Sequence, residues 1–219
     1  PYASRIPAKA RLRSYPVSEH SGMILAYFGP EGQEPSYEVP RIEELESDAF
    51  SELECSQIEI ATEPREVIEN VADIAHFLPV HGTRIDEFEM ILDGPRATQR
   101  AKGLGGSLDG RTLAVDSVAT YYGPAVQVTR LGWAYKLILI NAHVPIDHER
   151  LLLRFGVAIE RDEGRHHSRE VVLGHMAAAR DGYFQDVAIW ENKRYRERPI
   201  LADGDGPISE IRRWYQSFF

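Results

Sequence analysis

Hydrophobic residues in the middle of the chain fall in short segments separated by turn-forming residues, a pattern that is typical of strands. β-Branched and aromatic residues dominate 114–122 and 126–131, and apolar runs follow at 137–140 and 151–159. Turn-forming residues separate these runs, including Val144-Pro145-Ile146-Asp147 between the last two. The pattern predicts an antiparallel meander of strands between 88 and 172.

Helices are predicted on both sides of this sheet in the sequence. The first begins near Glu63-Pro64, because proline suits the first helical turn, and runs to His76. The second runs from about Gly174 to Tyr195 and ends before Pro199. Residues 1–48 instead indicate short strands at 11–17 and 22–30, and an acidic segment at 43–54 is expected to connect two units.

The stretch 70–82 carries the candidate chemistry. His76 and His81 lie five residues apart, so an unbroken helix would point their rings about 140° apart. Pro79 lies between them and offers no N–H to the carbonyl of Ala75. We therefore expect the helix to break after His76, which lets His81 turn back toward it. Two converging neutral imidazoles indicate a metal site with open positions.

A carboxylate is expected to complete such a site, and the last predicted helix supplies candidates. Asp186 lies within an apolar stripe at helical spacing, formed by Tyr183, Val187, Ile189 and Trp190. A carboxylate that faces a core is costly unless it is paired or bound to a cation. Asp186 is therefore preferred over Asp181 and Glu191. The alternative is that Asp186 pairs with an arginine of the sheet.

The remaining six histidines show no comparable spacing. They are interpreted as ordinary surface or hydrogen-bonded core residues: His20, His143, His148, His166, His167 and His175.

Composition and charge limit the classes of partner. The chain has 219 residues, of which 43% are hydrophobic and 27% charged, which is ordinary for a globular protein. Its net charge of −9 argues against nucleic acid and anionic membrane surfaces as partners. No apolar run reaches the ~18 residues that a membrane span needs, and no secretory signal is present, so the cytoplasm is expected. The basic cluster at 193–198 is expected to be solvated or to form an interface.

The motif Asn70, Asp73, His76 and His81, joined much later by Asp186, resembles the catalytic domain of Rieske-type non-haem iron oxygenases. The closing stretch 186–215 is similar to the steroid and sterol branch, which includes ketosteroid 9α-hydroxylase oxygenases and cholesterol 7-desaturases. Residues 6–24 resemble the strands that close a Rieske domain.

The resemblance implies an α+β fold in which a curved antiparallel sheet grips a long C-terminal helix, the helix-grip or START-like arrangement. Residues 1–46 would be the C-terminal remnant of a Rieske domain and 47–219 the catalytic mononuclear iron domain. His76, His81 and Asp186 would hold Fe(II). Asp73 would be the bridging acid on the electron path, and Asn70 would lie near the iron. The sheet would line an apolar cavity, with suitable residues at Tyr121, Tyr122, Trp133, Ile138 and Ile140.

A single cysteine, Cys55, departs from the family pattern, because a Rieske 2Fe–2S cluster needs two cysteines and two histidines. The cluster is therefore expected on a segment absent from this chain, or electrons come from a separate protein. The resemblance further implies O₂ and an apolar substrate, electrons from NAD(P)H through a ferredoxin or reductase, and a homotrimer.

The expected function is hydroxylation or desaturation of a steroid or sterol, with three alternatives. An oxygenase or demethylase of aromatic acids would need a basic group in the cavity, for which Arg84, Arg100 and Arg130 are candidates. A helix-grip lipid-binding protein would keep the fold without the catalysis. A zinc hydrolase fits the ligand types, but no general base is evident near the motif.

Overall fold

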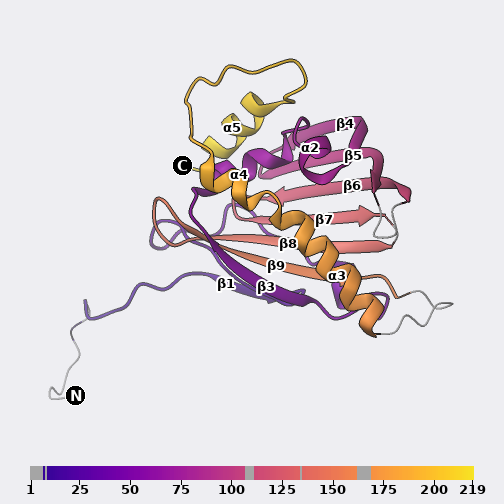
Figure 1. Ribbon diagram of the computed structural model, residues 1–219. Helices are drawn as coiled ribbons and strands as arrows, with labels where there is room; N and C mark the ends of the chain where they lie inside the picture. Colours follow the sequence, from indigo (N-terminus) through magenta and orange to yellow (C-terminus); the bar gives the residue numbers. More distant parts are fainter. Residues whose placement is uncertain (1–6, 8, 107–110, 134, 162–168) are drawn as a thin grey trace.

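A seven-stranded antiparallel sheet forms the centre of the computed structural model, which describes residues 7, 9–106, 111–133, 135–161 and 169–219 (Figure 1). The strand order is β3-β9-β8-β7-β6-β5-β4. The bounds are β3 Glu54–Ile60, β4 Arg84–Asp93, β5 Arg96–Gly106, β6 Thr112–Tyr122, β7 Val126–Gly132, β8 Lys136–Pro145 and β9 Leu151–Ile159. Strands β4 to β9 follow one another as a meander, so the predicted antiparallel sheet and the α+β class are confirmed.

Strand β3 was not predicted, although its sequence alternates. Ser56, Ile58 and Ile60 turn inward, whereas Gln57 and Glu59 are exposed. The flanking acidic residues conceal this period of two in the sequence. The strand pairs antiparallel with β9 and extends the meander at that edge.

The two faces of the sheet pack against different parts of the chain. Helix α3, Arg169–Phe184, crosses one face (Figure 1), and Met176 packs there against Leu137, Leu139 and Phe155. The side chains at the alternate strand positions, such as Ile138 and Ile140, lie on the opposite face and pack against residues 23–53. They form a second core with Ile42, Phe50, Val128 and Ala158. Alternation along β8 therefore separates the two cores.

The single helix predicted over 63–76 is wrong, because the structure divides this segment. It consists of α1 Pro64–Ile68 and a short 3₁₀ turn, η2 Glu69–Val71, and α2 follows at Phe77–His81. Pro79 does not break a helix, because it is the third residue of α2, where an N–H would have no intrahelical partner. The interruption lies at 72–76, where the Asp73 carboxylate accepts a hydrogen bond from the Ala75 N–H at 3.0 Å.

The last predicted helix is likewise divided. Helix α3 begins before the expected start at Gly174, and a turn at Gln185 and Asp186 separates it from α4, Val187–Asn192. A further helix, α5 Ile208–Gln216, was not predicted. It buries its apolar side on the helical segment that leads to the histidines, through Ile208, Ile211 and Trp214 against Ile68, Val71 and Ala72.

The strand predicted at 11–17 is wrong, because residues 11–16 form no strand, whereas the strand predicted at 22–30 is present but shorter. Strands β1, Val17–His20, and β2, Met23–Ala26, form a hairpin, and η1 follows at Glu43–Glu46. Ser21 and Gly22 connect the strands with φ of 51° and 74°, as a type I′ turn requires. The assignment of residues 1–46 to a Rieske domain stays a prediction.

His143 on β8 is a buried titratable group within the core. Its side chain is 3% exposed, neither ring nitrogen has a hydrogen-bond partner among the described residues, and its ring centroid lies 5.7 Å from that of Tyr121. Burial lowers the pKa of His143 to about 4. The folded protein therefore keeps this ring neutral at pH values at which the unfolded chain binds a proton.

His143→Phe should make the free energy of unfolding less dependent on pH. The folded pKa of about 4 lies below the ordinary 6.5, so stability is lost as the pH falls from 6.5 toward 4. The loss attributable to His143 is at most about 3 kcal/mol. Urea unfolding of both proteins across this range measures it. The exposed His148→Gln should keep the wild-type profile, and parallel profiles for wild type and His143→Phe would contradict the assignment.

Candidate metal centre

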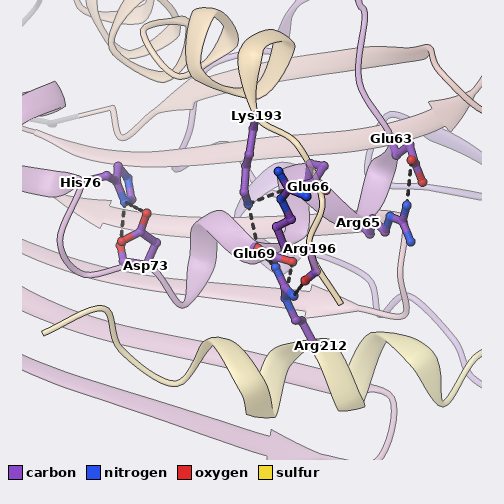
Figure 2. A network of polar contacts seen from close by, with 9 residues as sticks. All are labelled: Glu63, Arg65, Glu66, Glu69, Asp73, His76, Lys193, Arg196 and Arg212. Carbon is purple, nitrogen blue, oxygen red and sulfur yellow. Dashed lines mark hydrogen bonds and ion pairs between the residues drawn. The ribbon is translucent and has the colours of Figure 1, made fainter. Parts of the chain in front are cut away.

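His76 is held by its own chain segment. Its ring is 8% exposed, and Nδ1 donates to the backbone carbonyl of Asp73 at 2.6 Å. Because a carbonyl only accepts, Nδ1 carries the proton and Nε2 is left with its lone pair. His76 therefore bonds the backbone of Asp73, while the Asp73 carboxylate Oδ2 lies 3.7 Å from Nδ1 (Figure 2).

His81 lies at the C-terminal end of α2 and turns back toward His76. The two ring centroids are 5.2 Å apart and the planes are inclined by 81°. Nδ1 of His81 lies 3.1 Å from Oε1 of Gln185, and Nε2 lies 3.4 Å from Oδ2 of Asp186. Gly82, with φ of 63°, ends α2 immediately afterwards. The convergence of the rings expected from the sequence is therefore present, although the chain reaches it differently.

Asp186 comes from the turn between α3 and α4 and is 1% exposed. Its Oδ2 accepts a hydrogen bond from Nδ2 of Asn70 at 3.0 Å. Its Oδ1 is buried and has no hydrogen-bond partner among the described residues. The expected stripe holds for Tyr183, Val187 and Trp190, whereas Ile189 is exposed.

Potential ligand atoms of His76, His81 and Asp186 all lie within 4.8 Å of one another. Two imidazole nitrogens and one carboxylate oxygen form the donor set that suits non-haem Fe(II). The unpartnered Oδ1 of Asp186 is the atom that a cation would satisfy, because a buried carboxylate oxygen is otherwise destabilising. The residues present therefore fit a metal ion.

The two histidines differ in their readiness to bind a metal. Burial lowers the pKa of His76, although the charges of Asp186 and Asp73 oppose this effect. Burial also acts to lower the pKa of His81, but the hydrogen bond and charge of Asp186, with a contribution from Gln185, outweigh it and raise the pKa. His76 is thus held neutral, whereas a metal ion has to displace a proton more often from His81.

A cavity of about 320 Å³ opens beside these three residues, between α3 and the sheet. Most of its lining is apolar, including Val115, Leu131, Trp133, Leu139 and Tyr183. Small side chains of α3 face it and leave the space open; they are Ala178, Ala179 and Gly182. No lysine, arginine or glutamate within the described ranges lines the cavity.

Some sequence-predicted lining residues face elsewhere. Tyr121 and Trp133 line the cavity as expected. Ile138, Ile140 and Tyr122 were wrong, because they lie on the opposite face of the sheet and pack in the second core. Tyr121 and Tyr122 are neighbours in one strand, so their side chains lie on opposite faces of the sheet. A β-rich sequence alone does not show which of the two faces the cavity.

The other candidate residues lie outside the cluster. Arg84 bonds Asp86, Arg100 lies 3.7 Å from Glu89, and Arg130 bonds Glu44. On the last helices, Asp181 pairs with Arg180, and Glu191 accepts from the Ala61 N–H. Of the other histidines, His20, His143, His148 and His175 lie elsewhere, and His166 and His167 fall outside the described residues.

Three amide residues of the sheet that line the cavity were missed in the sequence, as was Gln185 after α3. Gln99 on β5, Gln127 on β7 and Asn141 on β8 are all buried. Nδ2 of Asn141 donates to Oε1 of Gln127 at 2.7 Å, while Oδ1 of Asn141 and Nε2 of Gln99 have no partner among the described residues. The sequence could have indicated Asn141, because it lies two residues after Leu139 in the same strand. The two side chains therefore face the same side of the sheet, where an amide among apolar residues is unusual.

Comparison with known families gives a match over nearly the whole chain. The 3-ketosteroid 9alpha-hydroxylase C-terminal domain matches residues 26–219. The oxygenase component of a Rhodococcus rhodochrous 3-ketosteroid-9-alpha-monooxygenase is 34% identical over 100% of this chain and 62% of its own length. Cholesterol 7-desaturase of Caenorhabditis elegans is 28% identical over 98% of the chain and 56% of its own length. The chain thus spans about three fifths of the length of these curated relatives.

Solved structures share the fold at low sequence identity. Dicamba monooxygenase bound to dicamba superposes with a TM-score of 0.75 at 13% identity, covering 99% of this chain and 73% of its own. Pseudomonas putida CBB5 NdmA with caffeine gives 0.67 at 16% identity, covering 97% and 64%. No helix in the described part of the chain is long and apolar enough to cross a membrane.

The resemblance drawn from the sequence is confirmed: the chain belongs to the 3-ketosteroid 9alpha-hydroxylase C-terminal domain family, in the steroid and sterol branch of the Rieske-type oxygenases.

Proposed function

We propose that this chain is the catalytic part of a terminal oxygenase that oxidises an apolar steroid or sterol with O₂. His76, His81 and Asp186 hold one ferrous ion, and Asn70 and Asp73 support these ligands. The observation that carries the proposal is the cluster of three ligand atoms within 4.8 Å beside an apolar cavity. The names of the relatives agree with an oxygenase that acts on a steroid.

The residues of this chain prepare the site in three ways. His76, His81 and Asp186 would hold a ferrous ion through two imidazoles and one carboxylate, and the ion would supply O₂ activation there. The Asp73 carbonyl fixes the tautomer of His76, so that its Nε2 points away with a lone pair. Asn70 holds Oδ2 of Asp186, which orients the carboxylate. Burial of His76 and Asp186 excludes bulk water from that side of the site.

The cavity favours a steroid or sterol over an aromatic acid. An acid would need a cation near its carboxylate, and Arg84, Arg100 and Arg130 are engaged elsewhere. Gln99 offers an unpartnered N–H donor and Asn141 an unpartnered acceptor. The Gln99 N–H suits a carbonyl or hydroxyl oxygen, and the Asn141 oxygen suits a hydroxyl group, on an otherwise apolar ligand.

The electron supply lies outside this chain in the proposal. Cys55 is the single cysteine, so a 2Fe–2S cluster belongs to another segment or chain, as the greater length of the relatives also favours. The Asp73 side chain is 38% exposed and hydrogen-bonded within the His76 segment, which suits an entry point for electrons from a neighbouring subunit of a homotrimer. NAD(P)H through a reductase is the proposed source. Residues 1–46 remain the proposed end of a Rieske domain.

Asp186→Ala and His76→Ala should each abolish stoichiometric metal binding. Removing a ligand should weaken binding by more than the roughly 10- to 100-fold effect of an outer partner. Anaerobic titration with Fe²⁺, read as bound iron per chain and as the rise in melting temperature, measures the change. The exposed Asp181→Ala on α3 is the control and should bind one ion per chain, as the wild type does.

This titration also separates the enzyme from the lipid-binding alternative. A folded wild-type chain that binds no iron would sink the oxygenase proposal and favour a lipid-binding protein. Full iron occupancy in Asp186→Ala would disprove the assignment of the third ligand.

Asn141→Leu should reduce discrimination between an oxygenated steroid and its hydrocarbon parent. The substitution removes the Oδ1 acceptor from the cavity lining, so the preference for a hydroxysteroid should fall by about tenfold. Equilibrium dissociation constants for the two ligands, measured on the iron-loaded chain, give the ratio. Gln57→Leu, on the exposed side of β3, is the control, and an unchanged ratio in Asn141→Leu would refute this role.

A further inference from the structure

A buried ion network ties the C-terminal segment to the helical turn that precedes the metal centre (Figure 2). Glu66 on α1 and Glu69 on η2 have side chains that are 4% and 6% exposed. Nζ of Lys193 lies 3.0 Å from Oε2 of Glu66 and 2.7 Å from Oε2 of Glu69. Nε of Arg212 lies 2.6 Å from Oε1 of Glu69. Two cations therefore balance two buried carboxylates, although Lys193 itself is 31% exposed.

This network is sensitive to the loss of either cation. Glu69 is the hub, because both Lys193 and Arg212 reach its carboxylate. Removing one cation would leave a buried negative charge without full compensation, which is strongly destabilising for the local arrangement. The carboxylate would then move toward water and take its backbone turn with it.

The turn that carries Glu69 also carries Asn70, whose side chain serves the metal centre. Asn70 donates to Oδ2 of Asp186 at 3.0 Å. The backbone closes around both residues, since the Ala72 N–H donates to the Glu69 carbonyl at 3.0 Å and the Asp73 N–H to that of Asn70 at 3.3 Å. A shift of Glu69 is therefore transmitted to Asn70 through the shared turn.

A third contact holds the same two chain segments together. The guanidinium carbon of Arg65 on α1 lies 3.7 Å from the ring centroid of Tyr195, and that of Arg212 on α5 lies 4.6 Å from it. Tyr195 follows Lys193 by two residues, so the segment after α4 is fixed against both helices. The basic cluster at 193–198 is thus not simply solvated, since Lys193 is engaged within the chain.

We propose that Glu69 is a positioning residue for the metal centre, held by Lys193 and Arg212 so that Asn70 keeps Asp186 oriented with Oδ1 toward the metal. This inference rests on the proposed function, because it assumes that Asp186 is a metal ligand. The C-terminal segment acts on the centre through Asn70 and touches no ligand itself among the contacts described above.

The test compares Arg212→Gln with Arg213→Gln on the full chain, using Co²⁺ as a spectroscopic probe. Arg213 is the matched control, since it is the next residue of α5 and its pair with Glu210 is exposed. Arg212→Gln should raise the Co²⁺ dissociation constant by about tenfold, the scale of an outer partner of a metal ligand. Arg213→Gln should leave it unchanged, and Arg212→Lys should recover part of the affinity.

A double-mutant cycle with Asn70→Ala separates positioning from general destabilisation. If Glu69 acts through Asn70, Arg212→Gln should weaken Co²⁺ binding much less once Asn70 is already alanine. An equal tenfold loss in both backgrounds would overturn the proposal. Lys193 pairs with the same carboxylate, so Lys193→Met, which removes that pair, replaces Arg212→Gln in the cycle if Arg212→Gln does not fold.

The outcomes distinguish this inference from the proposed function. A wild-type chain that binds no Co²⁺ or Fe²⁺ would overturn both. A wild-type chain that binds metal, with Arg212→Gln equal to Arg213→Gln, would overturn the positioning role alone.

Discussion

The buried carboxylate of Asp186 is the constraint on which the candidate site depends. Asp186 is 1% exposed, so its negative charge needs compensation. Asn70 and His81 both contact Oδ2, whereas Oδ1 has no partner among the described residues. Such an arrangement is destabilising by itself and becomes favourable when a cation is bound. The apparent defect in hydrogen bonding is therefore the strongest physical argument for a metal ion.

Bringing Asp186 to the histidines requires most of the chain. Asn70 and Asp186 are 116 residues apart, and the whole meander from β4 to β9 lies between them. Helix α3 packs on one face of the sheet and ends at the turn that presents Asp186. Helix α5 then packs against the turn at Glu69. Segments that precede and follow the meander in the sequence therefore meet beside the metal centre. The site is thus specified by tertiary packing and by a balanced group of buried charges.

Sequence patterns predicted the elements well where the physical signal is local. Short β-branched, aromatic and apolar segments between turn signals indicated the antiparallel sheet, and an acid in an apolar helical stripe singled out Asp186. The course of 72–81 could not be read in the same way, because the Asp73 carboxylate and a short-range turn, rather than Pro79, interrupt the helix. Tyr121 and Tyr122 show the same limit, since one residue of register decides which face each occupies. Asn141 could be recognised as a cavity residue only once the face of β8 that carries Leu139 was known.

The most direct test of this account is anomalous diffraction from crystals of the Fe²⁺-loaded chain. The account predicts one iron peak, bonded to Nε2 of His76, to Nε2 of His81 and to the Oδ1 of Asp186 that otherwise has no partner. An iron peak elsewhere, or iron at the histidines with Asp186 turned away from it, would contradict the central claim.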